Sequence, residues 1–204
     1  MDFSPLKQAL RTPEIRRRIL FVLFILVLFR LLSYVPVPVP DNNALSIFLK
    51  RLFTSNDLLG FADLFSGGSL SNFSIIMMGL GPYINASIVM QLMTKVVPQL
   101  EATNKEGEAG RQRINQYTRL LTVPFAIVQA IGMVLLIQQS SIQIASTDLI
   151  GHPSPAQWFL MVLTMTAGSM LLMWMGELVT EKGVGNGISL IIFAGIVASL
   201  PTQL

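Results

Sequence analysis

The sequence predicts an all-α, polytopic membrane protein, because its composition and its apolar runs both differ from those of a soluble domain. Hydrophobic residues make up 52% of the 204 residues and charged residues only 12%, whereas a soluble domain carries about 25% charged residues. Apolar runs recur along the chain at lengths close to the roughly 20 residues that cross a bilayer, and basic residues flank these runs. We expect five membrane-spanning helices and one short re-entrant helix.

The composition also narrows the possible chemistry. The chain has no cysteine, which excludes disulfides and thiolate metal sites. Its single histidine, His152, leaves little scope for histidine-based catalysis or metal binding. Nucleic-acid binding would need a dense basic face with aromatic residues, but the net charge is only +3. We therefore expect no cofactor, no metal site, no catalytic residue and no enzyme activity.

The first element is a cytoplasmic amphipathic N-terminus, residues 1–18, which leads into a first span at residues 19–35. Three arginines at 16–18 precede the apolar run as they would in a signal peptide, but no small-residue cleavage site follows. We therefore expect the span to be retained. Arg30 lies inside this span, where an arginine costs about 2.5–3.5 kcal/mol on insertion scales. Two interpretations stay open: the guanidinium snorkels or binds backbone carbonyls, or it contacts a substrate.

An external segment, residues 36–73, follows the first span. The alternating valines and prolines of residues 35–40 predict an extended backbone, because each proline disfavours the helical conformation of the residue before it. Residues 44–53 are amphipathic and predict a surface helix. A second short helix is expected at about residues 58–71, directly before the second span.

The stretch around that second short helix indicates function most clearly. Between Asp63 and Lys95 there are 31 residues without a charge, but the first third of them is rich in glycine and serine. A glycine inside a helix costs about 1 kcal/mol, and irregular backbone at membrane depth persists only where protein covers it or water fills a cavity. A short helix, a glycine break and a span at residues 74–96 therefore predict a pore or transport protein.

The rest of the chain alternates spans with loops. We expect a charged cytoplasmic loop at 97–119, a third span at 120–138, an external loop at 139–155, a fourth span at 156–178, a cytoplasmic loop at 179–187 and a fifth span at 188–204. The segments placed inside then hold 11 Lys and Arg residues, and those placed outside hold only Lys50 and Arg51. Because Lys and Arg are enriched in cytoplasmic loops, the N-terminus is expected in the cytoplasm.

Four motifs occur in order along the chain. They are LFSGGSLS at 64–71, PYINASI at 82–88, GRQRINQYTR at 110–119 and WMGELVTEKGVGNGIS at 174–189. Together they resemble the bacterial SecY family of protein-conducting channels. The resemblance implies ten spans in two inverted halves that close around a pore, and this chain is similar to the first half only, since it stops at residues 201–204 after the fifth span.

The resemblance implies a pore ring formed by Ile84 and Ile88 in the second span and by Ile192 and Ile196 in the fifth. Each pair is spaced i, i+4, so both side chains share one helix face. Branched aliphatic side chains make no directional hydrogen bonds to a passing chain, and a hydrophobic constriction gates ions by dewetting. The ring would therefore close the pore to ions without binding the passing chain.

Three further groups of residues take roles from the same resemblance. The plug helix at 58–71 would use Leu58, Phe61, Leu64, Phe65, Gly67, Gly68 and Leu70. The lateral gate would use Asn85 and Gln91. The cytoplasmic partner loop would use Arg111, Arg113 and Arg119.

The implied function is that of the central subunit, N-terminal half, of a channel in the bacterial cytoplasmic membrane. It would move unfolded preproteins across this membrane and release membrane segments sideways into it. The implied partners are SecE-like and SecG-like small membrane subunits, a SecA-type ATPase or a ribosome, an unfolded polypeptide with a signal sequence, and the lipid bilayer. No direct recognition of nucleic acid is expected apart from ribosome docking.

Three alternatives remain. A secondary transporter also uses broken helices and inverted repeats, but it would want ionisable groups at mid-membrane, where Arg30 stands alone. An intramembrane enzyme would need a nucleophile and a base, but His152 lies in an external loop and Glu177 at the end of a span. A truncated or nascent chain of the SecY family would have no channel activity of its own.

Overall fold

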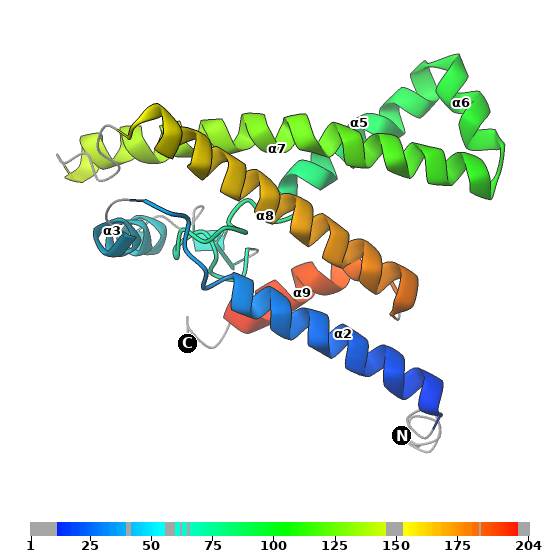
Figure 1. The fold of residues 1–204 in the computed structure, drawn as a ribbon, viewed down its shortest axis with the longest axis horizontal. Helices are drawn as coiled ribbons and strands as arrows, with labels where there is room; N and C mark the ends of the chain where they lie inside the picture. The colour runs from blue at the N-terminus through cyan, green and yellow to red at the C-terminus, as the bar shows by residue number, and fades with distance from the viewer. Residues whose placement is uncertain are drawn as a thin grey trace.

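The computed structural model describes residues 12–39, 42–55, 60–61, 63–64, 66–145, 153–183 and 185–199. Within these ranges the protein is helical and has no strand, which confirms the all-α class (Figure 1). The helices are α2 Pro13–Leu32, α3 Asn42–Ser55, α5 Gly81–Val96, α6 Pro98–Lys105, α7 Glu108–Ala145, α8 Pro155–Lys182 and α9 Gly187–Ser199. An isolated antiparallel bridge joins Pro36 to Ser74.

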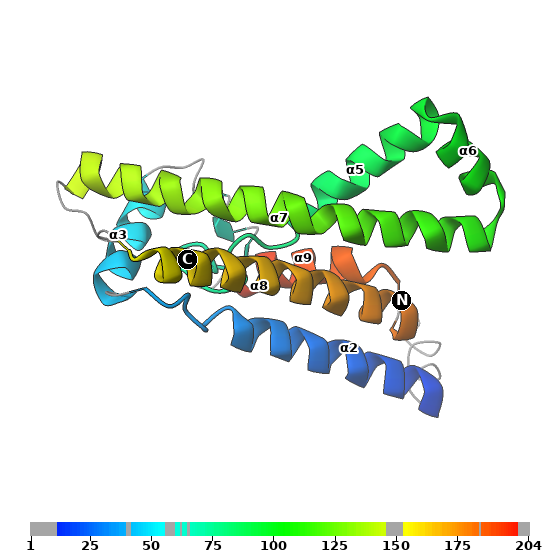
Figure 2. The same ribbon diagram turned by 45° about the horizontal axis from the view of Figure 1, so that its top comes forward.

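Helix α8 is the centre of the bundle. It lies between α7 and α2 and also contacts α9 (Figure 2). Its start is fixed by a capping box, in which the Ser154 hydroxyl accepts from the amide of Gln157 and the Gln157 side chain accepts from the amide of Ser154. Methionines and small residues then fill its buried sides, and the adaptable shape of methionine suits a helix that touches α2, α5, α7 and α9.

A helical hairpin projects from one end of this bundle. It consists of α5, α6 and the first part of α7, with α6 at its tip (Figure 2). The cytoplasmic loop expected at residues 97–119 is therefore largely helical, and the sequence-based assignment of a loop is wrong on this point. Pro98 starts α6 at a position where proline costs no backbone hydrogen bond.

The second predicted span also needs correction. Helix α5 begins at Gly81 and not at Ser74, because residues 66–80 form consecutive turns. We call residues 63–80 the broken segment; its residue 65 lies outside the described part of the chain. Backbone at Gly67, Gly68 and Gly79 has φ of 69°, 78° and 58°, a conformation that ends helices and that glycine adopts without strain.

The same turns correct the predicted plug helix at 58–71. Residues 60–61 and 63–64 are helical, but residues 66–71 are turns. Leu58 and Phe65, two of the predicted plug residues, lie outside the described residues, as does His152. The short helix is therefore at most the first part of the expected one, and the glycines and serines form a compact loop.

Two described helices are long and apolar enough to cross a membrane, at Glu108–Ser141 and Pro155–Lys182. They contain the predicted third and fourth spans. Helices α2, α5 and α9 fall on the other predicted spans but are shorter or more charged. The count of five spans stays a prediction.

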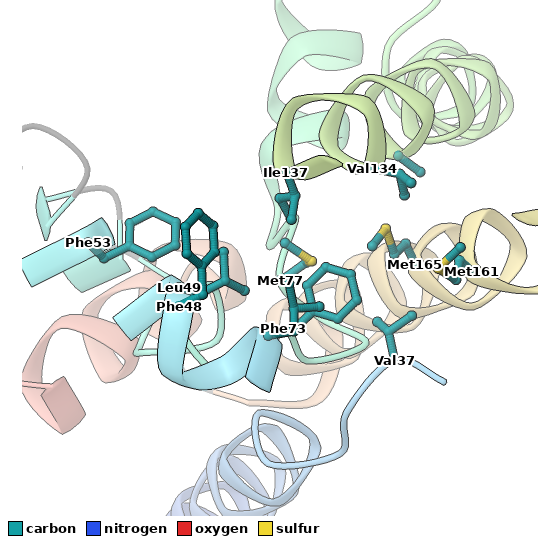
Figure 3. Packing of buried hydrophobic residues seen from close by; sticks show 12 residues of the cluster. Val37, Phe48, Leu49, Phe53, Phe73, Met77, Val134, Ile137, Met161 and Met165 are labelled. Carbon is teal, nitrogen blue, oxygen red and sulfur yellow. The ribbon is translucent and has the colours of Figure 1, made fainter. Parts of the chain in front are cut away.

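The largest cluster of buried apolar side chains surrounds the broken segment (Figure 3). Phe73 and Met77 of that segment pack among side chains of α3, α7 and α8. The buried members are Val37, Leu45, Phe48, Leu49, Phe53, Phe73, Met77, Ala130, Val134, Ile137, Met161 and Met165. Full burial of one such large side chain contributes roughly 1.5–3 kcal/mol. Protein therefore covers this irregular backbone, as its composition requires.

Candidate functional site

The glycine- and serine-rich loop of the broken segment satisfies its backbone with its own side chains. The Asp63 carboxylate accepts from the Ser71 amide at 3.0 Å and from the Ser66 hydroxyl at 3.3 Å. The hydroxyls of Ser69 and Ser71 donate to the carbonyls of Ser66 and Gly68, at 2.8 and 3.1 Å. Short polar side chains of this kind compete well with helical hydrogen bonding, which explains why the loop is compact without being a helix.

A cavity of about 690 Å³ lies against the broken segment. Its walls come from that segment, from α5 and α7, and from one residue of α9. The lining residues are Ser66, Leu70, Met77, Met78, Gly79, Leu80, Gly81, Ile84, Gln129, Gly132, Met133, Leu136 and Ile192. Only Ser66 and Gln129 contribute polar side chains, and none of the lining residues is charged. This does not resemble the polar midplane site expected of a secondary transporter.

Two of the four predicted pore-ring residues meet at this cavity. Ile84 of α5 and Ile192 of α9 both line it, although 108 positions separate them in the sequence. Ile88 lies one turn further along α5, is half-exposed and does not line the cavity, and Ile196 is partly buried and also outside the lining. Two of the four predicted ring residues therefore line this cavity and two do not.

The predicted lateral-gate residues lie on the exposed surface of α5. Asn85 is exposed, and the exposed Gln91 donates from Nε2 to the hydroxyl of Ser87 at 3.1 Å. Beside them runs an apolar row at four-residue spacing, formed by Ile84, Ile88, Leu92 and Val96, whose exposed fractions rise from 38% to 75%. This part of α5 is uncovered within the described protein.

The three arginines of the partner loop have different surroundings. Arg113 pairs with Glu106 at 3.4 Å across the hairpin tip, and Arg111 is exposed on α7. Arg119 instead pairs with Glu177 of α8 at 2.6 Å, which ties the hairpin to the central helix. A further exposed pair joins Lys105 to Glu101, and that hydrogen bond lowers the pKa of Glu101.

Contacts between distant segments are not indicated by the sequence. Arg30 donates to the carbonyl of Gly67 at 2.8 Å, so of its two interpretations the structure shows the one in which it binds a backbone carbonyl. A methyl group on Gly168 of α8 would overlap the carbonyl of Ile75. Glycine at 168 is therefore required by a close approach, for which an isolated glycine in an apolar helix was the only available signal.

The comparisons with known proteins agree on one family. A family model described as SecY matches residues 74–204. The chain is 38% identical over 200 residues to the protein translocase subunit SecY of Streptomyces scabiei, covering 97% of this chain and 46% of that protein. The SecY of Escherichia coli K12 is 44% identical over 201 residues, and the match covers 98% of this chain and 44% of that protein. The SecY of Buchnera aphidicola subsp. Acyrthosiphon kondoi is 45% identical, and the match covers 98% of this chain and 54% of that protein.

The chain spans about half the length of the curated relatives it matches. Among solved structures, Sec61 in the canine ribosome–channel complex from the endoplasmic reticulum matches with a TM-score of 0.59. It shares 21% sequence identity and the match covers 88% of this chain and 36% of that chain. At this identity the likeness concerns the fold.

Proposed function

The chain belongs to the SecY family, and we propose that it is the N-terminal half of the central subunit of a protein-conducting channel. In this role it moves unfolded preproteins across the bacterial cytoplasmic membrane and releases membrane segments sideways into the bilayer. The observation that carries the proposal is the apolar cavity at which the broken segment meets Ile84 and Ile192.

The apolar wall of the cavity is suited to passage of a polypeptide that is not chemically changed. Its wall is almost entirely apolar, so it offers a passing chain few hydrogen bonds that would hold it. An apolar constriction also excludes ions by dewetting while it is narrow. In the complete channel Ile84, Ile88, Ile192 and Ile196 form the ring, and the plug beside it is the segment expected at residues 58–71, of which the structure describes 60–61, 63–64 and 66–71. Ile88 and Ile196 join the ring only when the second half supplies the opposite wall.

The uncovered face of α5 suits a second role. Asn85 and Gln91 lie on this face with the apolar row at 84, 88, 92 and 96, and such a row needs a cover of protein or lipid. We assign the face to the lateral gate, where the second half of the channel covers it at rest and a signal sequence separates the two. Small SecE-like and SecG-like subunits brace the halves.

The projecting hairpin is suited to docking the partner that drives translocation. Arg111 and Arg113 lie on it, with Arg111 exposed, whereas Arg119 is engaged with Glu177. A ribosome or a SecA-type ATPase docks here on the cytoplasmic side, and the likeness of the fold to Sec61 in a ribosome–channel complex supports the ribosome. The orientation can be measured with single cysteines: one from Gln112→Cys should be labelled only from the cytoplasm, and one from Ile47→Cys only from outside.

The decisive experiment measures ion conductance of the complete reconstituted channel without substrate. Replacing Ile84, Ile88, Ile192 and Ile196 by serine should wet the constriction and give a resting ion leak. Two neighbours on α9 serve as a matched control, because Phe193 and Val197 are 63% and 45% exposed and lie outside the cavity. If the fourfold variant has the same resting ion conductance as the parent, these isoleucines are packing residues and the proposed gate is wrong.

A further inference from the structure

Arg30 is the only charged residue of the predicted first span, and its guanidinium reaches across to the broken segment. Its Nη1 donates to the Gly67 carbonyl at 2.8 Å, and its Nη2 donates to the Tyr34 hydroxyl at 3.0 Å. The guanidinium carbon lies 5.1 Å from the centre of the Tyr34 ring. Tyr34, just beyond the end of α2, thus holds the guanidinium in place while the guanidinium holds Gly67.

The carbonyl of Gly67 differs from its neighbours in where its partner lies. The other carbonyls of residues 66–70 accept hydrogen bonds from within residues 66–74. These bonds are Ser69 hydroxyl to Ser66, Ser71 hydroxyl to Gly68, Ser74 amide to Ser69 and Phe73 amide to Leu70. The donors to Ser66 and Gly68 lie within the loop and those to Ser69 and Leu70 follow it directly. The donor to Gly67 comes instead from the first predicted span, so this bond must break if the loop moves away from α2.

The opposite side of Gly67 is held by packing. Its φ is 69°, and a methyl group there would lie 3.1 Å from the α-carbon of Gly195 in α9. Gly67 is thus clamped between Arg30 of the first predicted span and Gly195 of the last. Gly195 lies one turn from Ile192, which lines the cavity, so the clamp and the cavity wall share the same part of α9.

We propose that Arg30 is a positioning residue that latches the first part of the broken segment, residues 63–71, in its resting place, and this inference rests on the channel function proposed above. A hydrogen bond from a charged donor changes an equilibrium constant by roughly tenfold to a hundredfold. A substrate that displaces the segment must overcome this bond. Arg30 thereby sets the threshold that a signal sequence has to exceed, and a channel without it opens to weaker signals.

The test measures access to the cavity in the complete complex reconstituted in vesicles, with other cysteines of the complex replaced. A thiol introduced by Gly132→Cys reports on the cavity wall, because a β-carbon at residue 132 has no neighbour within 4 Å beyond its own stretch of α7. Adding Arg30→Gln should raise both the resting maleimide-labelling rate and the resting ion conductance by about tenfold or more. Arg30→Lys, which keeps a charged donor, should restore part of the latch.

Arg18→Gln is the matched control, because Arg18 is exposed on the same helix, and it should change neither measurement. The proposal is overturned if Arg30→Gln leaves labelling and conductance at parent values, or lowers only the yield and thermal midpoint of the complex. If Arg30→Gln does not assemble, Tyr34→Phe removes the hydroxyl partner of the guanidinium; a smaller rise in labelling is expected, and no rise overturns the latch.

The labelling measurement separates this proposal from the channel function. A parent complex that transports no preprotein contradicts the channel function, while labelling still decides whether Arg30 holds the segment. A parent that transports, combined with an Arg30→Gln variant of unchanged labelling, contradicts the latch alone.

Discussion

Both parts of the broken segment consist mainly of turns but are held in different ways. Residues 63–71 bond mainly to themselves and to the two residues that follow at 73 and 74. Gly67 also contacts Arg30 and Gly195, and Leu70 packs against the buried cluster from its edge. Residues 73–80 bond to the extended run after α2: the amide of Val37 donates to the Phe73 carbonyl, and the amide of Ile75 donates to the Val35 carbonyl, both at 2.9 Å. The first part resembles a detachable loop and the second an anchor.

Burial follows the same division. Phe73 is 2% exposed, and Ile76 and Met77 are almost completely buried. In the first part, Gly67 and Ser69 are buried but offer little apolar surface, and Leu70 is only partly buried. Because apolar burial is the main source of stability, damage to the anchor should unfold the protein, whereas damage to the loop should only release it. Four substitutions test this difference.

The largest effect is expected from Phe73→Ala in the anchor. Removing a buried phenylalanine leaves a cavity between α3, α7 and α8 and typically costs about 3–5 kcal/mol. The variant should show a large fall in thermal midpoint of the whole complex in detergent. Phe61→Ala is the comparison, since Phe61 is 59% exposed; an equal loss there would contradict the division into loop and anchor.

Gly168→Ala disturbs the packing of the anchor against α8. The added methyl group would overlap the Ile75 carbonyl, so either the helix or the anchor must shift. Overpacking of this kind costs about 1–3 kcal/mol, and the same melting experiment should detect it. Gly132→Ala on α7 has open space around the new methyl group and should not lower the midpoint; if it does, glycine is needed for some reason other than close approach.

Asp63→Ala should loosen the loop alone. It removes the carboxylate acceptor of the Ser71 amide and of the Ser66 hydroxyl, and hydrogen bonds to a charged group are each worth about 1.5–3 kcal/mol. Hydrogen exchange at the Ser71 amide should accelerate at least tenfold, while exchange at the Ile75 amide stays at the parent rate. Parallel acceleration of both amides would show that loop and anchor open together.

The smallest effect is expected from Arg119→Gln, which breaks a bond outside both parts. The pair with Glu177 is partly exposed, with side-chain exposures of 49% and 18%, and such pairs contribute no more than about 1 kcal/mol. The thermal midpoint should fall slightly and exchange at Ser71 and Ile75 should not change. A large change in either amide would mean that the hairpin is coupled to the broken segment.

The features of this protein that depend on local pattern could be predicted from its amino-acid sequence. Low charge and repeated apolar runs predicted the all-α class, amphipathic spacing predicted the helix at 44–53 that the structure has as α3, and Gly67 with Gly68 predicted a break. These predictions succeed because helix periodicity and the positive φ of glycine act over a few residues.

The extent of the break and the contacts that hold it depend on tertiary packing. Nothing local indicated that turns continue to residue 80, because their stability comes from Val35, Val37 and Gly168, all distant in sequence. The contact of Arg30 with Gly67 joins residues 37 positions apart, and that of Arg119 with Glu177 joins residues 58 positions apart. Hydrogen bonds and close packing depend on distance in space, which a single sequence does not contain, so the charge inside the first span could be noticed but its partner could not be named.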